Sequence, residues 1–575
     1  MKEGVRRSHR YDGVVGVFID TWRPYAWLFT LAFATYAWTT GFGFSPLDDR
    51  WMIVDRMDEL RHLSAVPAVF TRAVLQIYYR PLLALSFVID ATAGRGGPFA
   101  FHLTNVLLHG LVSATLFAFF TKLDLTRRSA FLLSALFAVH PVHVHAVAWI
   151  PGRNDVILAL FALGATITFL DYLASRSAAA LALHVCFFAL ALLTKESATV
   201  LPLVLLSYLL FSKATKIKTV VLVSCWAVIL ALWALAWRLM VHGASSIEHW
   251  DFRGVAIDAA SGFILYCGKL IVPLQQAVFP TVRDSSLLPG LLALAAGVLI
   301  ATWRGFADRR KALFGVVWFL LLISLSLLHG SSNGIGEHYE HRLYLPSIGF
   351  LLMVSQIDFG GLVTTRPKKV AFTVAYLLLI GVLFGRTVYR SATYRDERSL
   401  AEAGVRESPH LYLAHMVRGT VLSDAGEYDL AVVDFNKAFD CLPENSPNRA
   451  AVDVRLATSL SKQGRSSEAV DHYLKALLVL PGDADVRANL GNELSRLGRL
   501  DEAISNYSRA IEIRPAFAKA HNNLGVALMK QRRIAEGVRQ FSEAVRIQPD
   551  YPGARQNLDR ALKLMSDRPV PGASD

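Results

Sequence analysis

Apolar blocks of roughly 18 to 22 residues fill the sequence up to about Arg390, and then they stop. That length matches the ~30 Å of hydrocarbon that a membrane-spanning helix must cross. With 53% of its 575 residues hydrophobic and only 18% charged, the chain does not have the composition of ordinary water-soluble domains. The sequence therefore predicts an all-α protein, in which a polytopic helix bundle precedes a soluble part.

The spacing of the blocks predicts about eleven spans and one ambiguous segment. The predicted spans are 25–44, 99–121, 129–148, 155–174, 178–194, 197–211, 219–241, 286–303, 312–329, 344–358 and 370–389. If the loops rich in Lys and Arg lie in the cytoplasm, the segment 259–280 must be re-entrant or interfacial and cannot be a full span. The odd number of spans then sends the C-terminal domain, and the loop 45–98, to the outer side of the membrane.

This topology divides the chain into five parts. They are a cytoplasmic N-terminus (1–24), a membrane domain (25–390), a linker (391–411), a repeat domain (412–565) and a disordered tail (566–575). Alanine- and arginine-rich, lysine-poor usage in the apolar half is compatible with a bacterial inner membrane, or with the endoplasmic reticulum if the chain is eukaryotic. The formal charge of +13 gathers at the ends of apolar blocks. The positive-inside rule accounts for it, so we expect membrane lipids and not nucleic acid as the partner.

Polar residues gather on the predicted outer side. Asp48 and Asp49 stand where the first span leaves the membrane, and Arg80 precedes a proline in the same loop. A carboxylate there could act as a general base for a hydroxyl or hold a metal ion that bridges phosphates. The alternative is that it caps the following helix. His102, Asn105 and His109 share one face of the second span, where they suit a phosphate and a polar substrate or serve as packed hydrogen-bonding groups.

A second cluster of polar residues lies in the stretch "HPVHVHAVAWIPGRND", which directly follows an apolar run. His140 and His143 are spaced as metal ligands could be, but no cysteine or nearby carboxylate completes a zinc set, so a divalent metal stays open. Arg153 and Asp155 suit a phosphate clamp and its orienting acid, since a guanidinium matches phosphate oxygens.

At a later helix end, Lys195 and Glu196 either neutralise each other or leave Lys195 to face a second phosphate oxygen.

The soluble part repeats with a period of 34 residues, marked by Pro481, Pro515 and Pro549. This is the tetratricopeptide pattern, a solenoid of helix pairs. The predicted units are 412–445, 450–483, 484–517 and 518–551, with 552–565 as a closing helix.

Solenoids of this kind expose a concave groove for partners. Asn489, Asn523 and Asn557 recur one repeat apart, either as solvated surface residues or as groove amides that grip an extended acceptor peptide. The groove position is the one these residues would take in the nucleocytoplasmic N-acetylglucosamine transferase that the repeats resemble.

Taken in order, the motifs DD, YRPL, FHxxNxxLH, FAVHPxHxxAVAxxxGRxD, LTKE and HRLYLPS resemble those of the transmembrane and tetratricopeptide-repeat O-mannosyltransferases that modify cadherins, and of their bacterial relatives. The resemblance covers about 45–360 and continues in the repeats. It implies a polytopic glycosyltransferase with a polyprenyl-phosphate sugar donor and a catalytic acid in the first outer loop. One departure is His145, where the family leads us to expect an acidic residue.

The resemblance assigns roles to individual residues. Asp48 or Asp49 becomes the catalytic base, and Arg80, Arg153, Lys195 and Arg342 become candidates for the lipid phosphate. The expected function is inverting transfer of a sugar, mannose in the family, from polyprenyl phosphate to Ser or Thr of a protein recruited by the repeats. A membrane-anchored scaffold without catalysis is the first alternative, and a transporter or lipid-glycan polymerase is the second.

Overall fold

The computed structural model describes residues 21–74, 78–212, 216–241, 252–330, 338–358 and 365–566. The predicted N-terminus and C-terminal tail lie almost wholly outside these ranges. Within them the chain is all-α, and its only β-contacts are two isolated bridges, Val74 with Tyr78 and Phe306 with Ile357. It divides into two compact units between Ser408 and Pro409.

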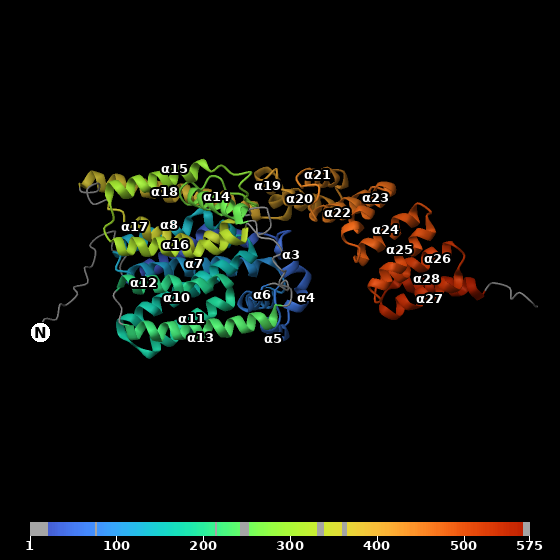
Figure 1. The fold of residues 1–575 in the computed structure, drawn as a ribbon, viewed down its shortest axis with the longest axis horizontal. Coiled ribbons are helices and arrows are strands. Elements are labelled where there is room, and N and C mark those ends of the chain that lie inside the picture. The colour runs from blue at the N-terminus through green and yellow to red at the C-terminus, as the bar shows by residue number, and fades with distance from the viewer. Residues whose placement is uncertain are drawn as a thin grey trace, which may run out of the picture. The chain divides into compact units, whose positions relative to one another are not determined.

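The first unit is a bundle of long helices (Figure 1). The longest are α7 (Pro98–Lys122), α10 (Arg153–Ser175), α13 (Lys216–Met240), α14 (Phe252–Ile271), α16 (Arg309–Gly330) and α18 (Arg366–Ser391). Shorter helices are α2 (Arg23–Tyr36), α6 (Pro81–Ala93), α8 (Arg127–Val139), α11 (Ala178–Thr194), α12 (Leu201–Ser212), α15 (Leu288–Arg304), α17 (Pro346–Ser355) and α19 (Glu397–Glu407). Short helices and 3₁₀ turns connect them: η1 (Ala37–Gly41), α3 (Asp48–Met52), η2 (Val54–Arg56), α4 (Met57–Leu60), η3 (Leu63–Ala65), α5 (Val66–Thr71), η4 (Pro141–His143), α9 (Val144–Val147), η5 (Ile150–Gly152), η6 (Glu196–Val200), η7 (Glu340–Leu343) and η8 (Ala392–Tyr394).

Length and composition qualify six of the described helices as membrane spans, or seven if the bent pair α8 and η4–α9 counts as one. Four other predicted spans correspond to shorter apolar helices, namely Ala178–Thr194, Glu196–Leu210, Leu288–Arg304 and Pro346–Ser355. A further short apolar helix, Pro81–Ala93, lies in the predicted outer loop 45–98. The first unit is therefore a multi-pass membrane bundle, and the count of about eleven spans stays a prediction.

The predicted span 129–148 corresponds to a bent pair of helices and not to one continuous helix, because the helix breaks at His140. Pro141 has no N–H to continue the ladder, and the His140 side chain accepts a hydrogen bond from Val142 N at 3.2 Å to start a new turn. The two parts meet at an angle of 51°. The break turns the chain into the segment 144–153, which carries the second polar cluster.

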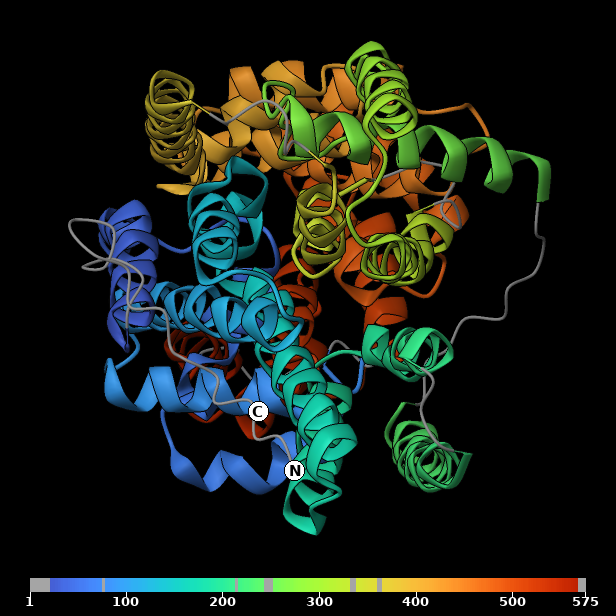
Figure 2. The same cartoon turned by 90° about the vertical axis from the view of Figure 1, so that its left-hand side faces the viewer.

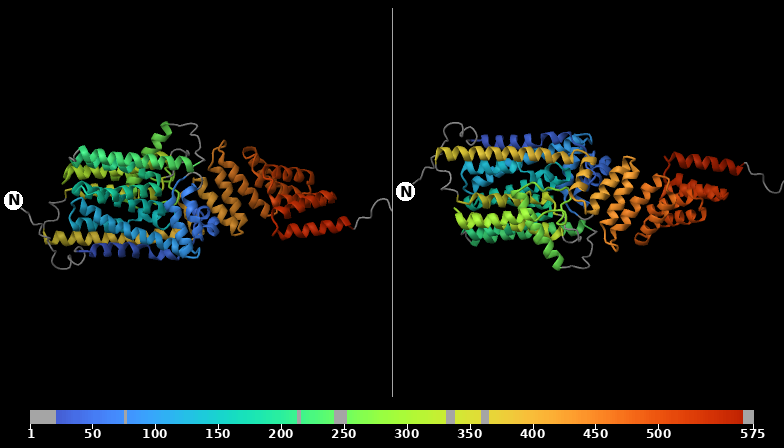
Figure 3. Two further views of the ribbon diagram at one scale, coloured as in Figure 1. Left: turned by 90° about the horizontal axis from the view of Figure 1, so that it is seen from below. Right: turned by 90° about the horizontal axis from the view of Figure 1, so that it is seen from above.

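Helix α14 overlaps the segment 259–280, for which the charge pattern predicts a re-entrant or interfacial course. In Figure 2 the long helices are seen end-on, whereas α14 (green) and α6 (blue) run across the view. The side views in Figure 3 agree with this for α14. Helix α14 is followed by the irregular residues 272–280, but it has the length and composition of a span, so the re-entrant or interfacial course stays a prediction.

The predicted linker 391–411 is mostly helical. Helix α18 continues to Ser391, and α19 begins at Glu397 after Asp396, whose carboxylate accepts a hydrogen bond from Ser399 N at 2.7 Å. Leu400 and Ala401 of α19 are buried, so α19 is part of the first unit.

The second unit consists of four helix pairs and a closing helix, in agreement with the 34-residue period. The pairs are α20 (Tyr412–Asp424) with α21 (Tyr428–Asp440), α22 (Asn448–Lys462) with α23 (Ser466–Val479), α24 (Ala484–Arg496) with α25 (Leu500–Ile513), and α26 (Ala518–Lys530) with α27 (Ile534–Ile547), and α28 (Pro552–Ser566) follows. Gly491 explains one repeated position, because a Cβ there would lie 2.7 Å from the Tyr507 ring of the paired helix.

Candidate functional site

The first acidic residues lie at the start of α3, after the extended segment that follows η1. Asp49 is 1% exposed, and its Oδ2 accepts a hydrogen bond from Ser45 N at 2.8 Å. No described residue donates to its Oδ1. His102 of α7 holds the same turn by donating to Gly43 O at 3.1 Å. Asp49 is thus a fixed carboxylate with one oxygen uncommitted.

The environment of the two carboxylates favours their protonated forms. Burial raises the pKa of Asp49 to about 7, and the neighbouring charge of Asp48 adds to the rise, whereas the hydrogen bond from Ser45 opposes it. Burial also raises the pKa of Asp48, against the attraction of Arg80. A carboxylate with a pKa near neutrality can accept and release a proton under physiological conditions.

Arg80, whose charge acts on Asp48, and Lys195 each form an ion pair. Arg80 grips Glu196 with two contacts, one of them from Nε to Oε2 at 3.0 Å, and its guanidinium covers the Tyr78 ring at 4.1 Å. Lys195 donates to both oxygens of Asp155 at 2.7 and 2.8 Å. The side chains of Arg80 and Lys195 are each 12% exposed, so both cations keep a small accessible edge.

Arg342 of η7 completes the group of cations. Its Nη1 donates to Ser326 O at 3.1 Å, and its guanidinium lies 5.4 Å from the centre of the Tyr339 ring. The charges of Lys195, Arg80 and Arg342 all act on Asp155, which places the three cations around one carboxylate. We call Arg80, Lys195 and Arg342 the cation group. The group carries three positive charges against the two negative charges of Asp155 and Glu196. It is therefore suited to attract a further anion such as a phosphate.

Arg153 has partners that differ from the predicted role in phosphate binding. It is fully buried and donates to Asn105 Oδ1 at 2.6 Å, to Phe101 O at 2.6 Å and to Ser86 Oγ at 3.0 Å. It also forms an ion pair with Asp90 at 2.5 Å. The guanidinium is therefore a structural brace that joins α6, α7 and α10.

Asn105, for which the sequence also suggests a substrate contact, braces the fold as well. Its Nδ2 donates to Val147 O at 3.0 Å and to Trp149 O at 3.2 Å, which holds the segment before Arg153. Gly152 fits there because a Cβ would lie 2.5 Å from His145 O.

The remaining histidines of the prediction are packing and hydrogen-bonding groups. His109 donates to Ala138 O at 3.0 Å and bonds Tyr344 OH at 2.6 Å, and His140 donates to Leu270 O at 3.1 Å. His143 packs against Phe137 with the rings tilted by 40° and their centres 4.2 Å apart. Within the described ranges, no three His, Cys, Asp or Glu side chains form a group that could hold a metal ion.

His341 is a residue of this region that the motifs do not single out. Its ring centre lies 4.8 Å from that of His145, and the charges of the cation group act on it. The motif HRLYLP contains it beside Arg342, but nothing in the sequence indicates that it meets His145.

In the repeat unit, Asn489, Asn523 and Asn557 lie on α24, α26 and α28, which pack side by side and form the inner helix layer. Asn523 donates to Asn492 Oδ1 at 2.8 Å, and Asn557 donates to Asn522 Oδ1 at 2.9 Å. All three predicted asparagines are half-buried on this layer.

Comparisons with known proteins agree with this architecture. A family model described as dolichyl-phosphate-mannose-protein mannosyltransferase matches residues 91–237, and a tetratricopeptide-repeat model matches 491–531. Human protein O-mannosyl-transferase TMTC4 is 25% identical over 442 residues, which cover 62% of this chain and 56% of that protein. Mouse TMTC1 is 38% identical over 135 residues, or 22% of this chain and 14% of that protein.

Among solved structures, YrrB, described as a tetratricopeptide protein with an unusual peptide-binding site, is 22% identical and covers 32% of this chain and 88% of its own, with a TM-score of 0.26. The fold and the two family matches indicate a membrane helix bundle similar to a mannosyltransferase domain, followed by a tetratricopeptide solenoid. In sequence, the chain is similar to the transmembrane and tetratricopeptide-repeat O-mannosyltransferases. It spans just over half the length of the first curated relatives that it matches.

Proposed function

We propose that the protein is an inverting membrane glycosyltransferase that moves a sugar from a polyprenyl-phosphate donor to Ser or Thr of an acceptor protein. The observation that carries this proposal is Asp49, a buried carboxylate with an uncommitted oxygen and a pKa raised to about 7, beside Asp48, on which the charge of Arg80 acts. A base and an anion site together are the two parts that such a displacement needs. Mannose is the sugar that the family implies.

In the proposed reaction, the acceptor oxygen forms a bond to the anomeric carbon as the bond from that carbon to the phosphate oxygen breaks. The phosphate leaves with the bonding electron pair, and the hydroxyl proton moves to Asp49. Arg80, Lys195 and Arg342 stabilise the charge that develops on the leaving phosphate. A single displacement inverts the configuration at the anomeric carbon.

The cation group supports lipid phosphate as the anion. Arg80 and Lys195 are ion-paired, and their side chains are only 12% exposed. They are therefore already largely desolvated and can bind a phosphate oxygen at little further desolvation cost. We place this site on the outer, periplasmic side of a bacterial inner membrane, as the distribution of Lys and Arg in the loops favours.

The test is transfer from a panel of radiolabelled polyprenyl-phosphate sugars to membrane proteins by the purified full-length protein. Label that becomes protein-bound through an alkali-labile Ser or Thr linkage supports the proposal. If a folded preparation transfers none of the sugars, the catalytic proposal fails.

The pH dependence follows from the raised pKa of Asp49. Only the unprotonated carboxylate can accept a proton, so kcat/KM should fall as the pH drops through about 7. The measurement is the initial transfer rate at subsaturating donor over a series of buffers at constant ionic strength. A rate that stays constant from about pH 5 to pH 9 would show that Asp49 is not the base.

We also propose that the inner helix layer of the repeats binds the acceptor through Asn489, Asn523 and Asn557. Replacing all three with Ala should raise the acceptor KM by about tenfold, since several hydrogen bonds to one peptide are lost. The measurement is transfer rate against concentration of the acceptor found in the panel assay. The matched control is Asn506→Ala on α25, where the amide donates only to Glu502 O of its own helix. Equal KM values for the two variants would refute the assignment.

A further inference from the structure

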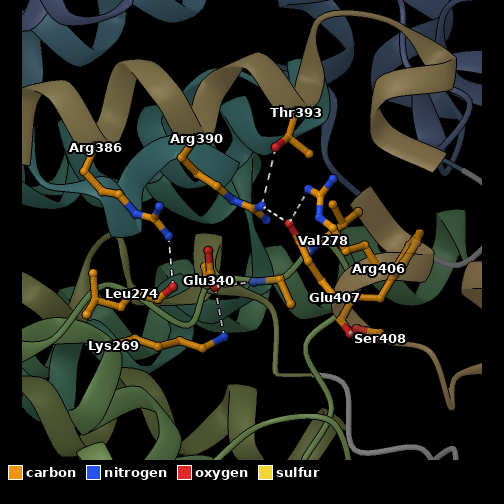
Figure 4. Close-up of polar contacts among 12 residues, drawn as sticks. Lys269, Leu274, Val278, Glu340, Arg386, Arg390, Thr393, Arg406, Glu407 and Ser408 are labelled. Carbon is orange, nitrogen blue, oxygen red and sulfur yellow. Dashed lines mark hydrogen bonds and ion pairs between the residues drawn. The ribbon is translucent and has the colours of Figure 1, made fainter. Parts of the chain in front are cut away.

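The irregular segment 274–280, which follows α14 and is buried from Gln276 onward, is fixed through its backbone by other elements (Figure 4). The contacts are Arg386 Nη2 to Leu274 O at 2.9 Å, Ala277 N to Glu340 Oε1 at 3.1 Å, Val278 N to Glu407 Oε2 at 3.0 Å, Ser408 Oγ to Phe279 O at 2.6 Å and His338 N to Pro280 O at 2.8 Å. Buried backbone groups must be paired, so these contacts determine where the segment lies.

Two of these contacts come from carboxylates on different elements, Glu340, which is buried, and Glu407, which is half-buried. Glu340 begins η7 and pairs with Lys269 of α14 at 2.9 Å, and both side chains are at most 3% exposed. Glu407 ends α19 and pairs with Arg390 of α18 at 2.5 Å. The two carboxylates accept hydrogen bonds from the consecutive N–H groups of residues 277 and 278. We call this arrangement the carboxylate clamp.

The clamp connects α19 with Arg342, a member of the cation group. Glu340 is two residues before Arg342, and both belong to the single turn η7. Tyr266 of α14 supports the same turn by donating to Tyr339 O at 3.2 Å. A shift of Glu407 therefore moves the segment 274–280, and with it the partner that holds Glu340.

We propose that Glu407, acting through the carboxylate clamp, is a positioning residue for Arg342 and so sets the affinity for the donor phosphate. This inference rests on the proposed function. Glu407 lies on a different element from every member of the cation group, and its hydrogen bond to Val278 connects it to Arg342 through the 274–280 segment and Glu340. The clamp differs from a brace such as Arg153 because one of its two carboxylates belongs to the turn that carries a cation of the site.

The test is Glu407→Gln in the full-length protein. Glutamine keeps an oxygen for Val278 N but loses the charge that pairs with Arg390, so the clamp relaxes. Binding of a radiolabelled polyprenyl monophosphate without sugar should weaken by about tenfold, and the donor KM should rise equally while kcat changes less than about twofold. The control is Glu402→Gln on the same helix, whose exposed pair with Arg398 at 3.0 Å lies outside the clamp.

A double variant separates positioning from loss of folding. Arg390→Met with Glu407→Gln leaves no uncompensated buried charge, so its unfolding temperature should recover toward that of the wild type. We expect donor affinity to remain low in this variant. Affinity that recovers together with the unfolding temperature would overturn the proposal, and so would equal binding by Glu407→Gln and Glu402→Gln. A wild-type protein that binds no polyprenyl phosphate would instead refute the proposed function on which the clamp rests.

Discussion

Asp49→Asn is expected to lower the transfer rate by about 10³-fold while leaving donor binding intact, because the amide cannot accept the proton of the acceptor hydroxyl. Asparagine fits the same space and keeps an oxygen for Ser45 N, which now bonds the carboxylate at 2.8 Å. The measurement is the single-turnover rate at saturating donor, with polyprenyl phosphate binding measured in parallel.

Although Asp49→Asn should lower the transfer rate, we expect it to maintain or raise the stability of the folded protein. Burial raises the pKa of Asp49 from 3.8 to about 7, so the folded chain binds a proton more tightly than the unfolded chain. The stabilisation that this provides is present below the unfolded-state pKa and is lost as the pH rises through about 7. At pH 8 the Asp49→Asn variant should therefore be at least as stable as the wild type, by up to about 4 kcal/mol.

Asp48→Asn is the matched control. Asp48 is only partly buried and lies on the same turn, so its replacement tests whether any carboxylate at this position suffices. We expect the loss of activity to be much smaller than for Asp49→Asn. A full loss in Asp48→Asn with activity retained in Asp49→Asn would exchange their roles, and an Asp49→Asn protein that is inactive because it is unfolded would contradict both expectations.

The sequence predicted the repeat unit closely because tetratricopeptide helices are determined by local periodicity. Pro515 and Pro549, for example, mark the joins between pairs, and the helices begin and end within a few residues of the predicted units. Local sequence patterns predicted the helices less well where a single residue determines the direction of the chain. Pro141 breaks a span that the hydropathy pattern predicts to be continuous, and α19 occupies a stretch that polar composition suggested was a linker.

For the candidate site, motif order brought together residues that the fold also brings together, such as Asp155, Lys195 and Arg342. It could not separate these from residues that brace the fold. The partners that decide the matter are distant in sequence, since Arg153 Nη2 donates to the carbonyl of Phe101, 52 residues away. Likewise, Glu407 was missed because its partner Val278 is 129 residues away.

Arg153→Met is expected to destabilise the membrane unit by about 3–5 kcal/mol, which is among the larger effects that a single substitution can have. Methionine fills much of the same volume but leaves Asp90 buried without its cation, and it removes the donor to Asn105, whose amide holds the loop before α10. The measurement is thermal unfolding in detergent, followed by circular dichroism. Adding Asp90→Asn should restore part of the loss, since it removes the unpaired charge.

The control for this experiment is Lys122→Met, which breaks an exposed ion pair with Asp171. Exposed pairs contribute about 0–1 kcal/mol, so this variant should unfold close to the wild-type temperature. If Arg153→Met were equally stable and only its donor affinity fell, Arg153 would be a phosphate ligand, as its motif first suggested. A large loss of stability that the second substitution partly reverses would instead establish that the guanidinium holds α6, α7 and α10 together, and that the anion site depends on the cation group alone.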